Sequence, residues 1–435
     1  MKSMIMRHIV VITALTALAF PAGLAAQAKN ARRFTVTALG TLGGTFSGAF
    51  PVNNKGWAAG DANSSGDATE HASLWRNNVI TDLGTLGGLN SGATSVNGWG
   101  LITGGAQTSA VDPLGEFWGL IFGCTPSGGS CQGYQNLVDG FTWQNGKMTP
   151  LPTLGGNNAY GFWTNNRGQV VGTAENNTQD PNCVSPQVLD FEAVVWGPRH
   201  GEIHELSALP GDTIGVAFGI NDKDQAVGGS GLCGFPSLAN LGHAVLWQNG
   251  LAIDLGNFGG VTNNSALAIN NLSQIVGLSD LAGDTTAHAF LWESGVIRDL
   301  GTLPGDFFSV GLGINYKGQV VGQSCHVNFN CRAFLWQNGV MADLNSLTPP
   351  GSSLSLLVGE GINSRGEIVG IAFDQSNGET LGFLAIPCDE EHADNEGCKD
   401  GAEGTTAERD DTTRVALPEN VRVQLRQRRG LGRPH

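Results

Sequence analysis

The chain has 435 residues, of which 65 are glycine and 14% are charged, and its net charge at pH 7 is −15. Glycine at this density without a period would indicate disorder, but here it recurs at fixed offsets, so a folded repeat protein is expected. An acidic surface repels phosphate backbones, which argues against nucleic-acid binding.

The first 28 residues have the pattern of a secretory signal peptide. Lys2 and Arg7 precede an apolar run, "IVVITALTALAFPAGLA", and residues 26–28, "AQA", match a small-x-small cleavage site. A membrane anchor is the alternative, but the run is short and contains Pro21. We therefore expect an exported protein, extracellular or periplasmic, without a membrane span.

Residues 33–387 contain a repeated phrase. One copy, "AHAFLWESGVIRDLGTLPGD", occupies 287–306, and variants of it recur along the chain about every 44 residues, apart from insertions. The leucines that anchor the copies, and near which the repeat units start, are Leu39, Leu83, Leu151, Leu206, Leu255, Leu300 and Leu344. The sequence therefore contains seven units.

Each unit carries four strand signals. In the fifth unit these are "SALAIN" (265–270), "QIVG" (274–277), "HAFLW" (288–292) and "VIRDL" (296–300). β-Branched and aromatic runs separated by Gly and Asn are typical of strands and hairpins. Four short strands in about 44 residues predict a β-propeller blade, whose middle strands are covered by neighbours on both sides.

The two ends of the repeat region are complementary. The last unit stops at "LGFLAI" (381–386), without its fourth strand, whereas "RFTVTAL" (33–39) is an extra strand before the first unit. Pairing of the two would remove two open sheet edges. We therefore predict a single all-β domain, a seven-bladed β-propeller closed by an N-terminal strand, over an open solenoid that would need capping repeats.

The repeat resembles the bacterial HAF-repeat family, named for the His-Ala-Phe seen here at 288–290. The resemblance covers about 39–386, with departures: Ser73 and Val245 replace Phe, Arg332 replaces His, and the second and third units lack the His. It implies an extracellular or envelope location. It implies no activity, cofactor or substrate.

Export gives the cysteines a meaning, because disulfides persist outside the reducing cytosol. We expect three local pairs and one long one, among Cys124–Cys131, Cys325–Cys331, Cys388–Cys398 and Cys183–Cys233. The long pair would join the loops of two neighbouring units; the alternative is two free thiols.

Insertions lie between the second and third strands of three units, at 105–138, 173–190 and 230–241. These loops share one face of a propeller, and function tends to lie in such loops. The longest contains "GEFWGLIFG" (115–123), in which Phe117 and Trp118 are candidate binding residues. The alternative is that this stretch folds back as a plug or a small core of its own.

Other candidate chemistry has structural explanations. His71, His243 and His288 begin third strands, and Asp82, Asp254, Asp299 and Asp343 end fourth strands. A pair that recurs in several units cannot be one active site, so we expect it to pin turns. "HGEIHE" (200–205) alternates metal-type ligands on an outer hairpin, where charges are normally solvated. We assign no catalytic residue, metal or cofactor.

Residues 388–435 form a tail with blocks of like charge and few apolar residues, which is typical of disorder. The sequence thus favours a monomeric binding or interaction scaffold that uses the long-loop face. Glycans, envelope polymers and other exported proteins are candidate partners. The alternative is a carbohydrate-active lyase or hydrolase on the same face, and whether the protein is an enzyme stays open, with binding favoured.

Overall fold

The structure is a computed structural model that describes residues 33–118, 122, 135–233, 241–389, 392, 398, 415–419 and 421–422. The expected signal peptide, Cys124, Cys131 and most of the expected disordered tail lie outside these residues. Contacts group Met1–Arg32 apart from Arg33–His435, and only the second unit is considered below. Within the described residues, no helix has the length and apolar character that crossing a membrane requires.

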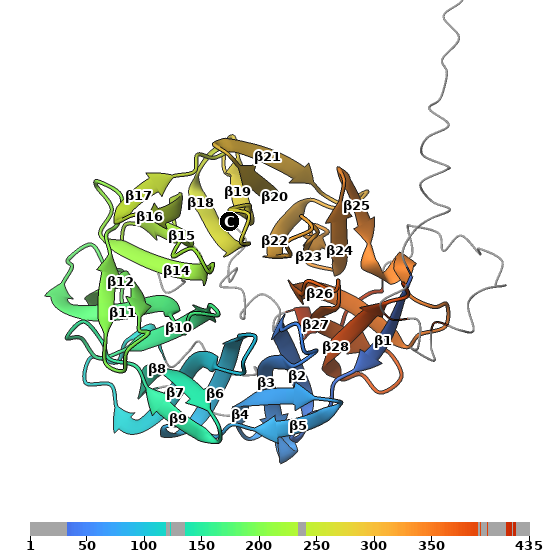
Figure 1. Cartoon of the computed structure of the whole chain (residues 1–435), viewed down its shortest axis with the longest axis horizontal. Coiled ribbons are helices and arrows are strands. Elements are labelled where there is room, and N and C mark those ends of the chain that lie inside the picture. Colours follow the sequence, from blue (N-terminus) through green and yellow to red (C-terminus); the bar gives the residue numbers. More distant parts are fainter. Residues whose placement is uncertain are drawn as a thin grey trace, which may run out of the picture. The chain divides into compact units, whose positions relative to one another are not determined.

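The described chain consists mainly of strands in groups of four, which we number 1 to 7 and letter a to d from the centre outward (Figure 1). Groups 1 to 3 contain β2 (Gly43–Val52), β3 (Ala58–Ser64), β4 (Glu70–Arg76) and β5 (Val79–Asp82); β6 (Gly87–Val96), β7 (Ile102–Val111), β8 (Asn136–Gln144) and β9 (Lys147–Pro150); and β10 (Ala159–Thr164), β11 (Val170–Gln179), β12 (Leu189–Trp196) and β13 (Ile203–Leu206).

Groups 4 to 7 contain β14 (Ile214–Ile220), β15 (Ala226–Gly231), β16 (His243–Gln248) and β17 (Leu251–Asp254); β18 (Gly259–Ile269), β19 (Ile275–Leu281), β20 (Ala287–Glu293) and β21 (Val296–Gly301); β22 (Phe308–Ile314), β23 (Val320–Cys325), β24 (Cys331–Gln337) and β25 (Val340–Asp343); and β26 (Leu354–Ile362), β27 (Ile368–Asp374) and β28 (Thr380–Pro387) with β1 (Phe34–Ala38). Two short 3₁₀ turns, Ser65–Asp67 and Leu344–Leu347, lie between strands.

These groups form an all-β propeller, as the sequence predicts. Within each group the strands pair antiparallel in the order a-b-c-d, and each group packs against the next around a ring (Figure 1). Groups 1 and 7 share one eight-stranded sheet, because a parallel bridge joins Phe46 to Thr380. The pairing therefore gives five separate four-stranded sheets and one sheet of eight, not seven separate sheets.

The N-terminal strand closes the ring, which confirms the sequence prediction. β1 pairs antiparallel with β28, in a register that places Phe34 opposite Pro387 and Ala38 opposite Phe383. Phe34 is buried in a cluster with Leu356 and Phe383. β1 thus supplies the fourth strand that the last unit lacks.

Each a strand has an irregularity at the same place, three residues before the turn into strand b. The residues at this position are Phe50, Thr94, Phe162, Phe218, Leu267, Leu312 and Glu360, and all are half-buried. A β-bulge leaves one residue unpaired and re-aims its side chain. The repeated bulge therefore lines the inner strands of the ring with a mainly apolar set of side chains.

The bulge explains the glycine that ends each "QIVG"-type strand. A Cβ on Gly277 would lie 1.9 Å from the carbonyl oxygen of Ser265 on the neighbouring a strand. The corresponding glycines of the other groups, Gly60, Gly104, Gly172, Gly228, Gly322 and Gly370, would meet a carbonyl oxygen at 1.9 or 2.0 Å. The repeat therefore requires glycine for close backbone approach.

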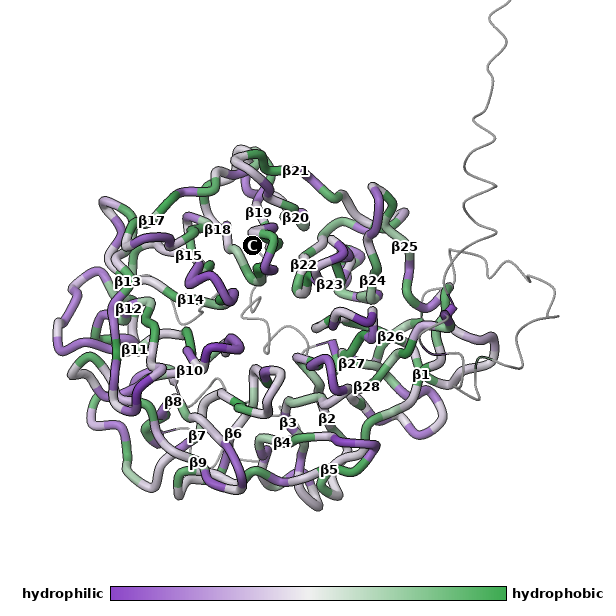
Figure 2. The backbone as a smooth tube through the Cα atoms, viewed as in Figure 1, coloured by the Kyte–Doolittle hydropathy of each residue, from purple (hydrophilic) through white to green (hydrophobic). Residues whose placement is uncertain are grey.

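A ring of asparagines runs through the a–b turns. In each turn the side-chain oxygen accepts backbone N–H groups of its own turn, and Nδ2 donates to the backbone carbonyl of the equivalent residue in the next group, as from Asn270 to Asn315 at 2.9 Å. The members in order are Asn53, Asn97, Asn165, Asn221, Asn270, Asn315 and Asn363, and Asn363 donates to Asn53. The hydrogen-bonded ring is thus closed at the turn face, the face formed by the a–b turns; in Figure 2 the turns after β10 and β14 are hydrophilic.

Tryptophans at the end of c strands join neighbouring groups. Nε1 of Trp75 donates to the carbonyl of Gly40, and that of Trp196 to the carbonyl of Pro152. Trp247 donates in the same way to Ser207. Each acceptor lies in the connection that precedes the group's own a strand, so burial of the ring and satisfaction of its N–H occur together.

Part of the C-terminal tail packs on the ring. Leu417 and Val421 are buried in a cluster that includes Leu357 and Phe373 of group 7, with Phe50 of group 1 beside it. These described tail residues are therefore packed on the propeller and are not solvated.

Candidate functional site

The inserted loops of groups 2, 3 and 4 meet on the face opposite the asparagine ring and build a second hydrophobic core. Its buried members are Phe117, Trp118, Phe122, Val138, Tyr160, Phe191, Ile214, Val216, Cys233 and Leu241. We call the described loop residues 111–118, 122, 180–188, 232–233 and 241 the loop platform. Because its core draws on three neighbouring groups, the platform ties these groups together.

The disulfide between Cys183 and Cys233 joins the loops of groups 3 and 4, with 4.4 Å between the Cα atoms. The long staple expected from the sequence is confirmed. Cys325–Cys331 and Cys388–Cys398 are also bonded, as expected. The first of these links the last residue of β23 to the first residue of β24. The expected Cys124–Cys131 bond lies outside the described residues.

Phe117 and Trp118 lie inside the platform. Their exposed fractions are 4% and 0%, their rings stack at 5.0 Å between centroids, and both meet Phe191 edge to face. The geometry favours the small-core interpretation of "GEFWGLIFG" over direct ligand contact, because neither side chain reaches the surface.

Two buried glutamates link the loop of group 2 to the loop of group 3. Glu116 accepts hydrogen bonds from the backbone N–H groups of Val188 at 2.9 Å and Leu189 at 2.7 Å. Glu175 accepts one from Nε1 of Trp118 and one from the N–H of Asn158 at 2.9 Å. Gln187 donates to both carboxyl groups. The polar contacts thus dock one inserted loop on the other beneath the aromatic core.

The pKa values of these two carboxyl groups are raised. Burial and, second, the charge of Glu116 raise the pKa of Glu175 to about 8, and burial raises that of Glu116. The pair therefore carries a proton at neutral pH, since two carboxylates in a low-dielectric site cannot both ionise cheaply.

Groups 2 and 3 replace the repeated histidine by an acid. Burial raises the pKa of Asp139 to about 6. Burial raises that of Glu192 to about 8, and the charges of Glu205 and Asp190 add to this effect. Sequence reasoning noted the missing histidines but did not identify these acids, although substitution at a repeated position was the signal. Perturbed carboxyl groups thus gather under the platform, as they do at many functional sites.

The histidines of the other groups have structural roles. Nδ1 of His71 lies 2.9 Å from Asp82, and Nδ1 of His288 lies 3.0 Å from Asp299. Each aspartate also accepts the N–H of a following glycine, as Asp82 does from Gly84. These contacts fit the expected turn-pinning role.

Two positions depart from the expected pairs. His243 contacts Asp212 at 2.9 Å instead of Asp254, because Asp212 reaches it from the preceding connection. Arg332, which replaces the histidine of group 6, binds both Asp343 and Asp306. In the "HGEIHE" stretch, exposed His204 contacts Glu202 at 3.1 Å.

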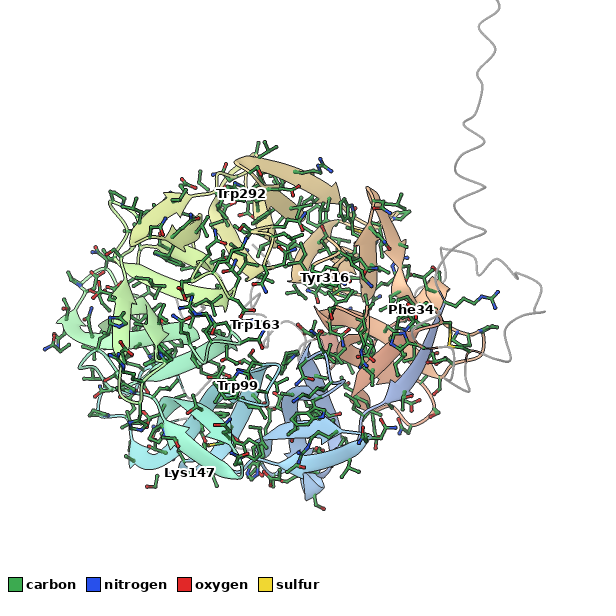
Figure 3. All side chains as sticks on the ribbon, viewed as in Figure 1. Phe34, Trp99, Lys147, Trp163, Trp292 and Tyr316 are labelled. Carbon is green, nitrogen blue, oxygen red and sulfur yellow. A yellow bond between two sulfur atoms is a disulfide. The ribbon has the colours of Figure 1, made fainter. Side chains whose placement is uncertain are left out.

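The platform exposes four aliphatic side chains. The exposed fractions are 63% for Val111, 39% for Leu114, 47% for Val184 and 59% for Leu232. Val184 and Leu232 directly adjoin the two bonded cysteines in sequence, so the disulfide keeps them close. The turn face differs: its exposed Trp99 and Tyr316 lie on the inner side of the ring (Figure 3).

Comparison with protein-family models and with curated proteins finds no match. The HAF-repeat resemblance therefore stays a prediction. Solved β-propellers are similar to this chain in fold. The β-propeller domain of the Trilobed protease from Pyrococcus furiosus has a TM-score of 0.42 at 10% identity, with 68% of this chain and 81% of that chain covered.

Two further solved structures show the range of proteins that share this likeness. A puromycin-hydrolyzing peptidase of Mycobacterium tuberculosis gives a TM-score of 0.43 at 11% identity, over 80% of this chain and 56% of the peptidase. The lectin of Aleuria aurantia gives 0.30 at 8% identity, over 82% and 96%. Similarity at this level concerns the fold and does not transfer a function.

Proposed function

We propose that this protein is an exported, monomeric binding scaffold that holds another exported protein on its loop platform. The observation that carries the proposal is the rigid platform itself, with its own core, a disulfide between groups and exposed Val184 and Leu232 beside that disulfide. Exposed apolar side chains on a pre-ordered surface are typical of protein interaction sites.

The chemistry of the surface favours a protein over a glycan. Its exposed large apolar residues are aliphatic, whereas Phe117 and Trp118, whose flat rings could stack on a sugar, are buried. Disulfides persist in oxidising compartments, which supports export, as does the HAF-repeat resemblance. Glycans and envelope polymers are the alternative ligands.

Site-specific photo-crosslinking tests this proposal. A photoreactive amino acid replaces Leu232 or, as the control, Val296, which is 65% exposed on the outer hairpin of group 5. We expect crosslinks to a distinct exported protein from position 232 and not from position 296. Equal labelling at both positions would contradict the proposal. So would glycan-array binding by the mature protein that Leu232→Glu abolishes.

The enzyme alternative rests on the raised carboxyl pKa values. Glu175, however, is 0% exposed and is held by Trp118, Asn158 and Gln187, so it faces protein groups and not substrate. A lyase or hydrolase would show turnover on polysaccharides that Glu192→Gln abolishes. We expect the same null rate for both forms.

A further inference from the structure

Two aspartates meet beside the long disulfide. Asp180 directly follows β11 and Asp190 lies in β12, so the inserted loop of group 3 brings them together. Their carboxylate oxygens and the sulfurs of Cys183 and Cys233 all lie within 4.8 Å of one another. The sulfurs are bonded to each other and offer no thiolate, so the hard oxygen ligands remain.

Each carboxylate has an oxygen without a hydrogen-bond partner. These atoms are Oδ2 of Asp180 and Oδ1 of Asp190, and both are buried. Asp190 is only 9% exposed. The other oxygen of Asp180 is engaged, because it accepts from the N–H and Nδ2 of Asn182 at 2.8 Å each. Two buried, unsatisfied carboxylate oxygens in one small space cost free energy unless a cation or a proton lies between them.

The surroundings add oxygen and negative charge. The hydroxyl of Thr213 contacts Asp180, and Glu192, two residues after Asp190 on the same strand, is close enough for their charges to interact. Within the described part of the chain, no Lys, Arg or His forms an ion pair with Asp180, Asp190 or Glu192. The excess negative charge therefore lacks a compensating side chain.

We propose that Asp180 and Asp190 bind a divalent cation of the Ca²⁺ type, with Thr213 and water completing the oxygen ligands. Ca²⁺ accepts carboxylate, hydroxyl and water oxygens in flexible geometry, whereas zinc favours thiolate and imidazole ligands that this site does not offer. The cation would fix the β11–β12 loop, which carries Val184, to the neighbouring group. This site goes beyond the proposed ligand surface and does not rest on it.

Calorimetric titration of chelator-treated protein with CaCl₂ tests the site directly. We expect a single Ca²⁺ per chain and a rise in Tm with CaCl₂, because a ligand that binds only the folded state stabilises it. Asp190→Asn should weaken binding by about 100-fold or more, since it removes a charged ligand. Asp254→Asn, an exposed aspartate on the outer hairpin of group 4, is the matched control and should bind as the unmodified protein does.

Asp180→Asn keeps the proposal testable if Asp190→Asn folds poorly. It should also abolish the Tm rise, and in chelator its Tm should exceed that of the unmodified protein, because the repulsion is removed. Two results would overturn the proposal: no heat and no Tm change up to millimolar CaCl₂, or a Tm that rises on acidification from pH 7 to 5 and ignores CaCl₂. The latter would show that the pair holds a proton instead. Parallel titrations with MgCl₂ and ZnCl₂ should give weaker binding, and tight zinc binding would contradict the oxygen-ligand assignment.

Discussion

The two faces of the ring are built on different principles. On the turn face, the same asparagine makes the same hydrogen bonds in every group and closes a ring through the equivalent carbonyls. On the loop face, groups 2, 3 and 4 depart from the repeat, with long loops, a shared aromatic core and one disulfide between groups. A repeated local pattern therefore makes the scaffold, and departures from the pattern make the candidate site.

The difference also appears in the charges. At the histidine position of the c strand, His71 and His288 form ion pairs with aspartates. Asp139 and Glu192 stand at the same position in groups 2 and 3 and have raised pKa values. The same position in the fold therefore stabilises a turn in one sector and stores unfavourable negative charge in another. Five substitutions test this contrast, from the largest expected effect to the smallest.

Ring closure is the strongest requirement of the repeated architecture. Phe34→Ala should lower the free energy of unfolding by about 3–5 kcal/mol, because it empties a buried site where β1 meets β28. Urea unfolding measures the change. Thr37→Ala, at an exposed position of the same strand, is the control and should cost under about 1 kcal/mol. Equal small effects would mean that closure by β1 is dispensable.

The disulfides separate the two sectors. Removing the bond between Cys183 and Cys233, which closes a separation of 50 residues, should cost about 4 kcal/mol in the chain-entropy description. Removing Cys325–Cys331, with a separation of 6, should cost about 2 kcal/mol. Paired Cys→Ser variants compared by thermal unfolding give both numbers. A larger loss from the short bond would contradict the view that the staple is what holds the platform.

The close approach at the bulge predicts a strong effect from a single methyl group. Gly277→Ala should destabilise by about 3 kcal/mol, since the Cβ would lie 1.9 Å from a carbonyl oxygen and the backbone must move. Gly40→Ala is the control, because nothing lies within 4 Å of its Cβ position. Chemical denaturation of the two variants should differ accordingly; if both are neutral, the ring is not tightly packed at the bulge.

The asparagine ring can be tested at one member. Asn270→Ala should cost about 2–3 kcal/mol, because it leaves buried backbone groups of two turns without partners. Asn270→Asp keeps the acceptor and loses the donor to Asn315, so it isolates the bond between groups. Exposed Asn271→Ala is the matched control. Similar stabilities for Asn270→Ala and Asn271→Ala would show that the ring contributes little.

The buried glutamate pair predicts a dependence on pH. Because the pKa of Glu175 is raised to about 8 in the folded state, the folded protein binds more protons than the unfolded chain above about pH 4.5. Stability contributed by this group therefore falls as the pH rises from about 5 to 8.

Glu175→Gln should remove this fall. Its unfolding free energy relative to the unmodified protein should improve between pH 5 and pH 8.5, as measured by urea unfolding at both values. Glu202→Gln, at an exposed position with a lowered pKa, is the control. An unchanged difference at the two pH values would mean that the carboxyl group of Glu175 is not protonated in the folded protein.

Much of the scaffold could be predicted because each repeat carries its own instructions. The order of four strands, the complementary ends and the local disulfides follow from patterns within about 44 residues. The role of the "QIVG" glycine could not be deduced in the same way, since it depends on a carbonyl of a neighbouring strand. The parallel bridge from Phe46 to Thr380, which merges two sheets, likewise joins residues far apart in sequence.

The sequence by itself determined the propeller, its closure by β1 and the pairing of Cys183 with Cys233, because strand period, turn residues and repeat spacing are local properties. The tertiary structure alone decided that Phe117 and Trp118 are buried and that Asp180 faces Asp190. It also decided that Leu417 and Val421 pack on the ring. These outcomes depend on which loops meet across neighbouring groups, where burial and uncompensated charge are set by contacts that no single repeat encodes.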